Sequence, residues 1–237
     1  MGTSWLGRLS GDSEPLGVAS GTVGILRSLM TQPARHVEAS TAAIVVPIRS
    51  FRVAKQRLSS VIDNDARSRL MREFAAIALD ACGPHASAVV TSDLDVYDFA
   101  AGRGVVVLDD PGSLDGAARR GFAWARAIGA DRVVVLHADL PFVRNLDDLV
   151  APGRARLAVL VPDQRRDGTP ALSLPVDTTF AFSYGPGSFA RHCLHAEAAG
   201  LAVQVLEDPD LGFDVDLPED MRVLQQRVTA SDPQPAS

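Results

Sequence analysis

The stretch Ala42-Ala43-Ile44-Val45-Val46-Pro47-Ile48 decides the fold of this chain. A continuous apolar run is typical of a strand that is covered on both faces, as in a parallel sheet between layers of helices. Similar runs follow at residues 88–91, 105–108, 132–136 and 155–161. We therefore expect a buried sheet that contains these five strands.

Segments with the period of a helix lie between these runs. The first begins at Asn64 or Asp65, either of which can cap it, and ends near Ala81. Shorter helices are expected at 96–101 and 115–128. Strands that alternate with helices predict an α/β fold with a mainly parallel sheet flanked by helices. Right-handed crossovers then place the loops after the strands along one edge, where ligands bind in such sheets.

The alternation ends after Val161. Residues 162–186 are rich in proline and glycine, which predicts a lid-like or antiparallel insertion. A helix at 188–199, a strand at 201–206 and a last helix from Pro218 complete the pattern. The prediction is a single domain over residues 41–228, with a flexible N-terminal extension over 1–40 and a disordered tail over 229–237.

Composition excludes some classes of function. The chain has 23 basic and 29 acidic residues, a net charge of −6, which argues against a nucleic-acid partner. It has neither an apolar run long enough to span a membrane nor a secretion signal, so we expect a cytoplasmic protein without a membrane partner. Cys82 and Cys193 are expected to be buried, reduced thiols. Nothing in the sequence indicates the oligomeric state.

A basic loop follows the first strand. It carries Arg49, Arg52, Lys55 and Arg57, and Lys55 is the one lysine of the chain. Cations at the carboxyl end of a buried strand suit a phosphate chain, although a solvated basic loop is the alternative interpretation. The Gly-Lys-Ser/Thr ending of a P-loop is absent.

Three aspartates suggest a metal site. Asp139 directly follows the strand at 132–136, and Asp214 and Asp216 alternate along one extended segment. Mg²⁺ prefers one or two carboxylates together with substrate phosphates and water, and it relieves the repulsion between paired carboxylates. As the alternatives, Asp139 and Asp216 would each cap a helix.

A fourth segment suggests anion binding. Gly185 and Gly187 let backbone amides approach a ligand, and Ser188 opens a helix whose N-terminus attracts anions. Asp167-Gly168-Thr169 belongs to the same group of loops. An ordinary turn and helix cap remains the alternative.

Taken in order, these segments resemble a known family. Val-Pro-Ile-Arg-(x)5-Lys-x-Arg-Leu from Val46, His-Ala-Asp-Leu-Pro from His137, Gly-Pro-Gly-Ser-Phe-Ala-Arg-His from Gly185 and Asp-Val-Asp-Leu-Pro-Glu-Asp from Asp214 carry the resemblance. It is to the guanylyltransferases that activate phosphoenolpyruvate or 2-phospho-L-lactate in the synthesis of the deazaflavin coenzyme F-420. It covers about residues 42–228.

The resemblance implies a nucleotide-diphospho-sugar transferase-like fold, GTP as donor and Mg²⁺ as cofactor. It also implies roles for twelve residues: catalytic Lys55, Arg49 and Arg57; metal-binding Asp139, Asp214 and Asp216; acceptor-binding Thr169, Gly185 and Ser188; nucleotide-binding Pro47, Asp93 and Asp115. Phosphoenolpyruvate is the favoured acceptor and 2-phospho-L-lactate the nearest variant. The other possibilities are a nucleotidyltransferase for another phosphorylated acceptor and a non-catalytic nucleotide-binding domain.

Three positions depart from the family pattern. Arg49 stands where the family usually has lysine, which keeps the charge and changes its geometry. Ser113-Leu114-Asp115 replaces Gly-Leu-Asn, so an amide becomes a carboxylate that only accepts hydrogen bonds. Arg166-Asp167-Gly168-Thr169-Pro170 replaces Gly-Thr-Gly-Thr-Asn. We therefore expect selectivity for the base and the acceptor to differ from the family most easily here.

Overall fold

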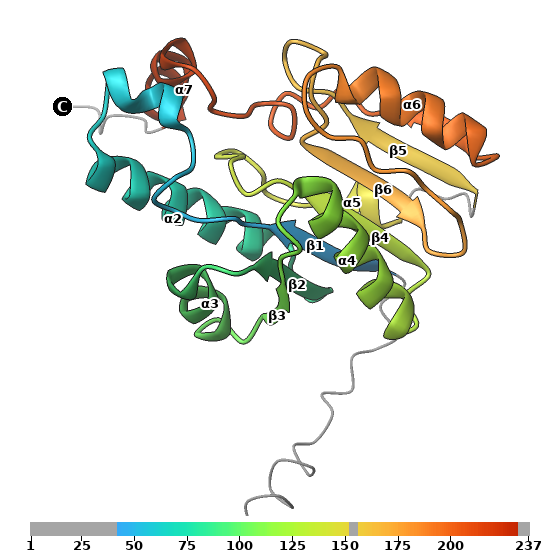
Figure 1. The fold of residues 1–237 in the computed structure, drawn as a ribbon. Coiled ribbons are helices and arrows are strands. Elements are labelled where there is room, and N and C mark those ends of the chain that lie inside the picture. Colours follow the sequence, from blue (N-terminus) through green and yellow to red (C-terminus); the bar gives the residue numbers. More distant parts are fainter. Residues whose placement is uncertain (1–41, 152–155, 232–237) are drawn as a thin grey trace, which may run out of the picture. The chain divides into compact units, whose positions relative to one another are not determined.

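The structure is a computed structural model that describes residues 42–151 and 156–231 (Figure 1). The predicted extension over 1–40 lies outside the described residues. The predicted tail over 229–237 overlaps the last helix at 229–231, and its remaining residues are not described.

Seven strands form one sheet in the order β3-β2-β1-β4-β6-β5-β7. They are β1 (Ala42–Pro47), β2 (Ala86–Thr91), β3 (Val106–Asp109), β4 (Arg132–Leu136), β5 (Leu157–Val161), β6 (Ala171–Pro175) and β7 (Ala202–Val205). β1, β2, β3 and β4 run parallel to one another, and β5 runs parallel to β7. β6 lies between β4 and β5 and is antiparallel to both. The predicted α/β fold with a mainly parallel sheet is confirmed.

Helices flank this sheet (Figure 1). They are η1 (a short 3-10 helix, Gln56–Ser60), α2 (Asn64–Ala81), α3 (Leu94–Ala101), α4 (Leu114–Ala127), α5 (Asp147–Val150), α6 (Ser188–Ala198) and α7 (Pro218–Ser231). η1 and α5 were not predicted from the sequence, because each is too short to display a helical period.

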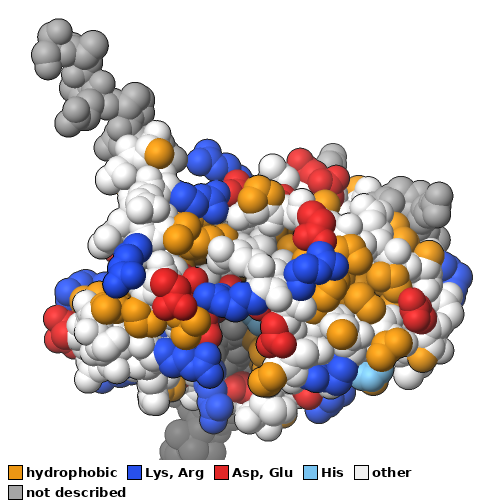
Figure 2. Space-filling model, turned by 90° about the horizontal axis from the view of Figure 1, so that it is seen from above, with side chains coloured by type: hydrophobic (Ala, Val, Ile, Leu, Met, Phe, Trp, Pro, Cys, Tyr) orange, Lys and Arg blue, Asp and Glu red, His pale blue; other side chains and the backbone are white. Residues whose placement is uncertain are grey.

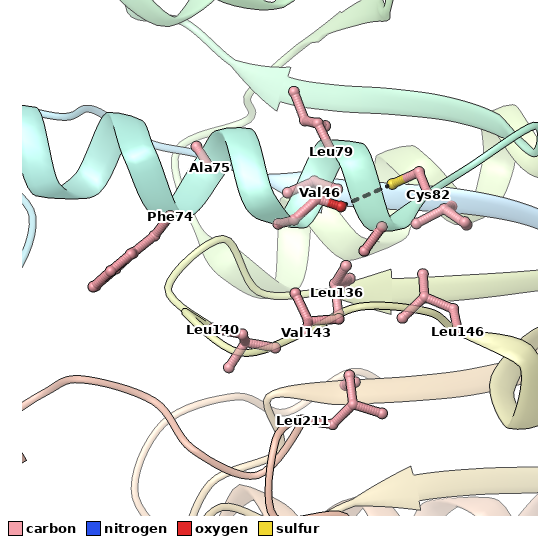
Figure 3. Packing of buried hydrophobic residues seen from close by; sticks show 14 of the residues in the cluster. Val46, Phe74, Ala75, Leu79, Cys82, Leu136, Leu140, Val143, Leu146 and Leu211 are labelled. Atoms are coloured by element: carbon pink, nitrogen blue, oxygen red, sulfur yellow. Dashed lines mark hydrogen bonds between the residues drawn. The ribbon is translucent and has the colours of Figure 1, made fainter. Parts of the chain in front are cut away.

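β1 shows why the apolar run is continuous. Ala42, Ile44 and Val46 belong to a core shared with α2, whereas Ala43 and Val45 belong to a second core shared with α4 and α6. Because side chains alternate along a strand, a strand covered on both faces must be apolar at every position. Figure 3 shows part of the first core, to which Phe74, Ala75 and Leu79 of α2 and Val46 and Leu136 of the sheet belong.

The cap of α2 lies one residue earlier than predicted. Asp63 has an extended backbone, and its side chain accepts a hydrogen bond of 2.7 Å from the Ala66 N–H. Asn64 is therefore the first helical residue, and the predicted caps at Asn64 or Asp65 are wrong. All three residue types suit an N-cap, so the sequence alone does not separate them.

The insertion after β5 proves to be antiparallel. β6 pairs with β4 on one side and β5 on the other, and all five of its residues are buried. Pro170 and Pro175 bound this short run, which hides it in the sequence because proline is depleted from central strands. The insertion thus contributes a central strand and extends the sheet toward β5 and β7.

Gly121 sets how closely α4 approaches β1. A Cβ atom at this position would lie 2.2 Å from Cγ1 of Val45, well inside van der Waals contact. We expect Gly121→Ala to lower the free energy of unfolding by about 1–3 kcal/mol because it overpacks the core. Denaturant unfolding of the purified variant measures this.

A double variant identifies the cause. Val45→Ala removes the methyl groups that the new Cβ would strike, so Gly121→Ala should cost less in the Val45→Ala background than in the wild type. Strictly additive losses would show that the contact with Val45 does not limit the position.

Candidate active site

Lys55 is the centre of the candidate site. Its Nζ lies 2.5 Å from Oδ2 of Asp139 and 3.2 Å from Oδ1 of Asp216. β1 and β4 are parallel neighbours, so the loop with Lys55 and the segment with Asp139 leave the sheet at the same edge. The sequence placed Lys55 and Asp139 at this edge, and the structure brings them into contact.

The backbone at Lys55 is in the left-handed region, with φ 54° and ψ 45°. Such a conformation costs a residue with a Cβ about 1–2 kcal/mol. The two carboxylates that hold the ammonium offset this cost, since a buried charge is retained where it is paired. Strain of this kind clusters at functional sites.

The charges around Lys55 perturb each other strongly. Burial alone would lower the pKa of Lys55, but Asp139 and Asp216 raise it above its usual value. Burial alone would raise the pKa of Asp139, whereas the Lys55 ammonium holds it below the usual range. Both groups are therefore charged at neutral pH. Asp214 differs: burial and the nearby Asp139 charge raise its pKa to about 6.

Two carboxylate oxygens at this site have no hydrogen-bond partner. Oδ1 of Asp139 and Oδ1 of Asp214 are both buried and unpaired. Hard anionic oxygens are the ligands that Mg²⁺ prefers, so these donors fit a divalent cation. Of the three predicted metal ligands, Asp139 and Asp216 pair with Lys55, whereas Asp214 acts on it through its charge. Within residues 42–151 and 156–231, no three His, Cys, Asp or Glu side chains are already placed to hold a metal.

A pocket of about 230 Å³ opens beside Lys55 and Asp139. Pro47, Arg49 and His137 are among its lining residues. The Arg49 side chain is exposed and makes no ion pair with the described part of the chain. The pocket therefore offers one guanidinium that is free to meet an anion.

The other cations of the loop lie at the rim. Arg57 Nη1 is 3.0 Å from Oδ2 of Asp216 with 72% of its side chain exposed, against 13% for Lys55. Arg52 pairs with Asp95 instead. Seen from above, basic and acidic side chains are interspersed on this face of the molecule (Figure 2). Of the four cations of the loop, Arg49 and Lys55 line the pocket, and phosphate binding by the loop stays a prediction.

The predicted acceptor residues also come together. Thr169 and Ser188 are buried, and their hydroxyl oxygens lie 3.3 Å apart. Gly185 has φ 100°, a conformation that glycine adopts without strain, and its carbonyl accepts the Ser188 N–H at 2.9 Å. His192 also contacts Thr169, a role that the sequence analysis did not assign.

The three residues predicted to bind the nucleotide lie in different surroundings. Pro47 lines the pocket at the end of β1. The Asp93 carboxylate caps α3 by accepting the N–H groups of Asp95 and Val96. Asp115 accepts the Tyr184 N–H at 2.7 Å, which joins α4 to the loop with Gly185. A nucleotide role for Asp93 and Asp115 stays a prediction, and both carboxylates already bond to backbone amides.

Asp220 supports the site without being anticipated. The residue is 4% exposed. Its Oδ2 accepts hydrogen bonds from the backbone N–H groups of Asp216, at 2.9 Å, and Leu217, at 2.7 Å. Its Oδ1 accepts from Arg165 Nη2 at 2.9 Å. The sequence could have indicated this role. Proline is common at the first position of a helix, and an acidic residue two positions later often accepts a hydrogen bond from the backbone N–H of the capping residue.

A solved structure shares this fold. A protein from Desulfovibrio desulfuricans G20 described as a nucleotide-diphospho-sugar transferase has the same fold, with a TM-score of 0.68 and 20% identity over 84% of this chain and 92% of that one. This likeness shows the fold, and the sequence comparisons show that the present chain is a nucleotidyltransferase.

The family follows from the sequence comparisons. The family described as "Guanylyl transferase CofC like" matches residues 42–226. Phosphoenolpyruvate guanylyltransferases from Conexibacter woesei and Rubrobacter xylanophilus are 36% and 37% identical, over 81% and 76% of this chain and 90% and 92% of theirs. The chain belongs to this guanylyltransferase family, as its motifs predicted.

Other relatives are named for different acceptor substrates. A 3-phospho-D-glycerate guanylyltransferase from Phenylobacterium zucineum is 33% identical over 76% of this chain and 87% of its own. A 2-phospho-L-lactate guanylyltransferase from Methanothermobacter thermautotrophicus is 27% identical over 75% and 81%. None of the helices in the described part of the chain could cross a membrane.

Removal of the Asp220 carboxylate should loosen the segment that carries Asp216. We expect Asp220→Ala to lower the free energy of unfolding by about 1–3 kcal/mol, because two part-buried N–H groups lose their acceptor. The exposed neighbour Glu219, which only approaches Arg165 at 4.0 Å, supplies the control Glu219→Gln. Equal stability of the two variants in denaturant unfolding would contradict the role assigned to Asp220.

Proposed function

We propose that this protein transfers GMP from GTP to phosphoenolpyruvate, with Mg²⁺, and releases pyrophosphate. The product would be enolpyruvoyl-2-diphospho-5'-guanosine, made in the cytoplasm for a deazaflavin coenzyme. The observation that carries the proposal is the Lys55 ammonium, held by Asp139 and Asp216 beside a pocket with the unpaired Arg49. The names of the relatives at 36% and 37% identity support the same donor and acceptor.

The reaction needs alignment and charge neutralisation more than acid–base catalysis. A phosphate oxygen of the acceptor attacks the α-phosphorus of GTP, a new P–O bond forms, and the bond to pyrophosphate breaks. Because the attacking oxygen is already an anion, no general base is required. Lys55, Arg49 and Arg57 would neutralise the phosphate oxygens and the leaving pyrophosphate.

The carboxylates have a complementary role. Asp139 and Asp214 would hold Mg²⁺ through their unpaired oxygens, with Asp216 as the third carboxylate. When bound, the cation would supply Lewis-acid charge neutralisation on the phosphates. Asp220 fixes the backbone of Asp216 and so sets where that carboxylate can reach.

The acceptor is the part that most needs a direct experiment. Purified protein is incubated with Mg²⁺, GTP and one acceptor at a time: phosphoenolpyruvate, 3-phosphoglycerate, 2-phospholactate or a sugar phosphate. Pyrophosphate release is measured. Fastest release with phosphoenolpyruvate is the expected result. Preference for another acceptor would reassign the substrate, and GTP binding without any release would indicate a non-catalytic nucleotide-binding domain.

Asp139→Asn tests the charge at the centre of the site. We expect pyrophosphate release to fall by a factor of about 100 or more while the protein stays folded, because the amide keeps the shape and loses the charge. Asp177→Asn is the matched control, since Asp177 is 72% exposed and pairs only with Arg156 at 3.8 Å. Near wild-type turnover of Asp139→Asn, with a normal circular dichroism spectrum, would remove Asp139 from the catalytic centre.

Asp167 tests the acceptor loop, where this chain departs from the family. Its carboxylate accepts the Gly187 N–H at 2.8 Å, within the loop that we propose binds the anionic acceptor. Asp167→Asn keeps an acceptor oxygen and removes the charge, so the KM for phosphoenolpyruvate should fall by about tenfold with kcat little changed. The KM for GTP serves as the internal control. An unchanged KM for the acceptor would show that the Asp167 charge does not oppose its binding.

A further inference from the structure

His192 is buried in a chain of hydrogen bonds that ends at the proposed acceptor site. It lies on α6 with 0% exposure, between the backbone of Ser183 and the side chain of Thr169. The Ser183 N–H points at Nε2 over 3.0 Å. A backbone N–H can only donate, so Nε2 must carry the lone pair and the ring proton must be on Nδ1.

The proton on Nδ1 determines the direction of the next bonds. Nδ1 lies 3.0 Å from Oγ1 of Thr169 and must donate to it. The Thr169 and Ser188 hydroxyl oxygens lie 3.3 Å apart, and either hydroxyl can donate to the other, so the contact between them uses one of their two protons. The second hydroxyl proton has no acceptor in the described part of the chain. The chain of bonds therefore ends in one unused donor, on Thr169 or Ser188.

We propose that His192 is a positioning residue, which donates to Thr169 so that one hydroxyl proton of the Thr169–Ser188 pair is directed toward the anion of the acceptor. The inference rests on the proposed function, in which the acceptor is a phosphorylated acid that these hydroxyls bind. A donor fixed in advance loses less conformational entropy when the anion binds. His192 acts through Thr169 and has no contact with the acceptor.

The surroundings keep His192 neutral. Burial, together with His195 and Arg191 on the same helix and His137 after β4, lowers its pKa to about 4, and only Asp115 of α4 acts in the opposite direction. The unfolded chain therefore takes up the proton first as the pH falls below the usual histidine value of about 6.5. The stabilisation that His192 provides is fully present above that pH and is lost as the pH falls toward 4.

The tautomer is measured on the wild-type protein by NMR of ¹⁵N-labelled histidine at pH 7. We expect Nδ1 protonated and Nε2 unprotonated, the opposite of the preference of free histidine in water. The signal is assigned by its loss in a His192 variant. An Nε2–H tautomer or an imidazolium ring at this pH would overturn the proposal, whether or not any variant is active.

Two matched variants then separate positioning from packing. In His192→Asn the amide N–H falls near the Nδ1 position and can still donate to Thr169. In His192→Gln the amide lies near Nε2, so the Ser183 contact is kept and the donor to Thr169 is lost. We expect His192→Gln to raise the KM for phosphoenolpyruvate by about 10- to 100-fold, because the Thr169 and Ser188 hydroxyls are no longer oriented and a hydrogen bond to the charged acceptor is lost. His192→Asn should stay within a few-fold of wild type.

Two controls make the result specific. His195→Asn changes a neighbouring histidine that bonds only to the Ala181 carbonyl and should leave the acceptor KM unchanged. The KM for GTP should not respond to any of the three variants. Equal KM values for His192→Asn and His192→Gln in an active enzyme would overturn the role of His192 alone. Absence of turnover in the wild type with every acceptor would overturn the proposed function and this inference with it.

Discussion

The buried ion pair between Lys55 and Asp139 is the interaction on which the site depends. A charge removed from water is tolerated where a partner of opposite sign offsets the loss of hydration. Here the partners come from the loop after β1 and the end of β4, and Asp216 joins them from the segment before α7. One ammonium therefore fixes three segments that are distant in the sequence, and it holds its own backbone in the left-handed region.

The chemistry of lysine explains why this position is not arginine. All the other basic residues are arginine, and those of the same loop lie where a large planar group reaches solvent or an exposed partner. Lys55 sits deeper, between two carboxylates, where a compact ammonium fits and a guanidinium would need more room. The same compactness suits the role proposed for Lys55, in which the ammonium would exchange carboxylate partners for phosphate oxygens. The acidic net charge of the chain is compatible with that proposal, because it needs only a few cations close together.

The sequence predicted the elements whose pattern is local, and the residues that those elements carry to one edge. The apolar run of β1, its neighbours and the position of Lys55 beside Asp139 follow from strand periodicity and parallel order. β6 could not be located in the same way, since its central place depends on pairing with β4 and β5 and prolines bound it. The role of His192 could not be predicted from the sequence. Its partners Ser183 and Thr169 lie 9 and 23 residues away along the chain, and only the fold brings them together.

The two halves of the site differ in how completely they are assembled. On the acceptor side, every polar atom from the Ser183 N–H to Thr169 already has a partner, and the Asp115 carboxylate joins this region to α4 through Tyr184. On the metal side, Asp139 and Asp214 each keep a buried oxygen without a partner, and the pKa of Asp214 is raised to about 6. Unpaired buried carboxylate oxygens are unfavourable until a cation or donor reaches them. The loops that we propose bind the acceptor are thus already held by hydrogen bonds. The carboxylates, in contrast, would be stabilised most by a bound cation. That asymmetry favours a site in which metal and nucleotide complete the charge balance around Lys55, and the acceptor enters loops that need little rearrangement.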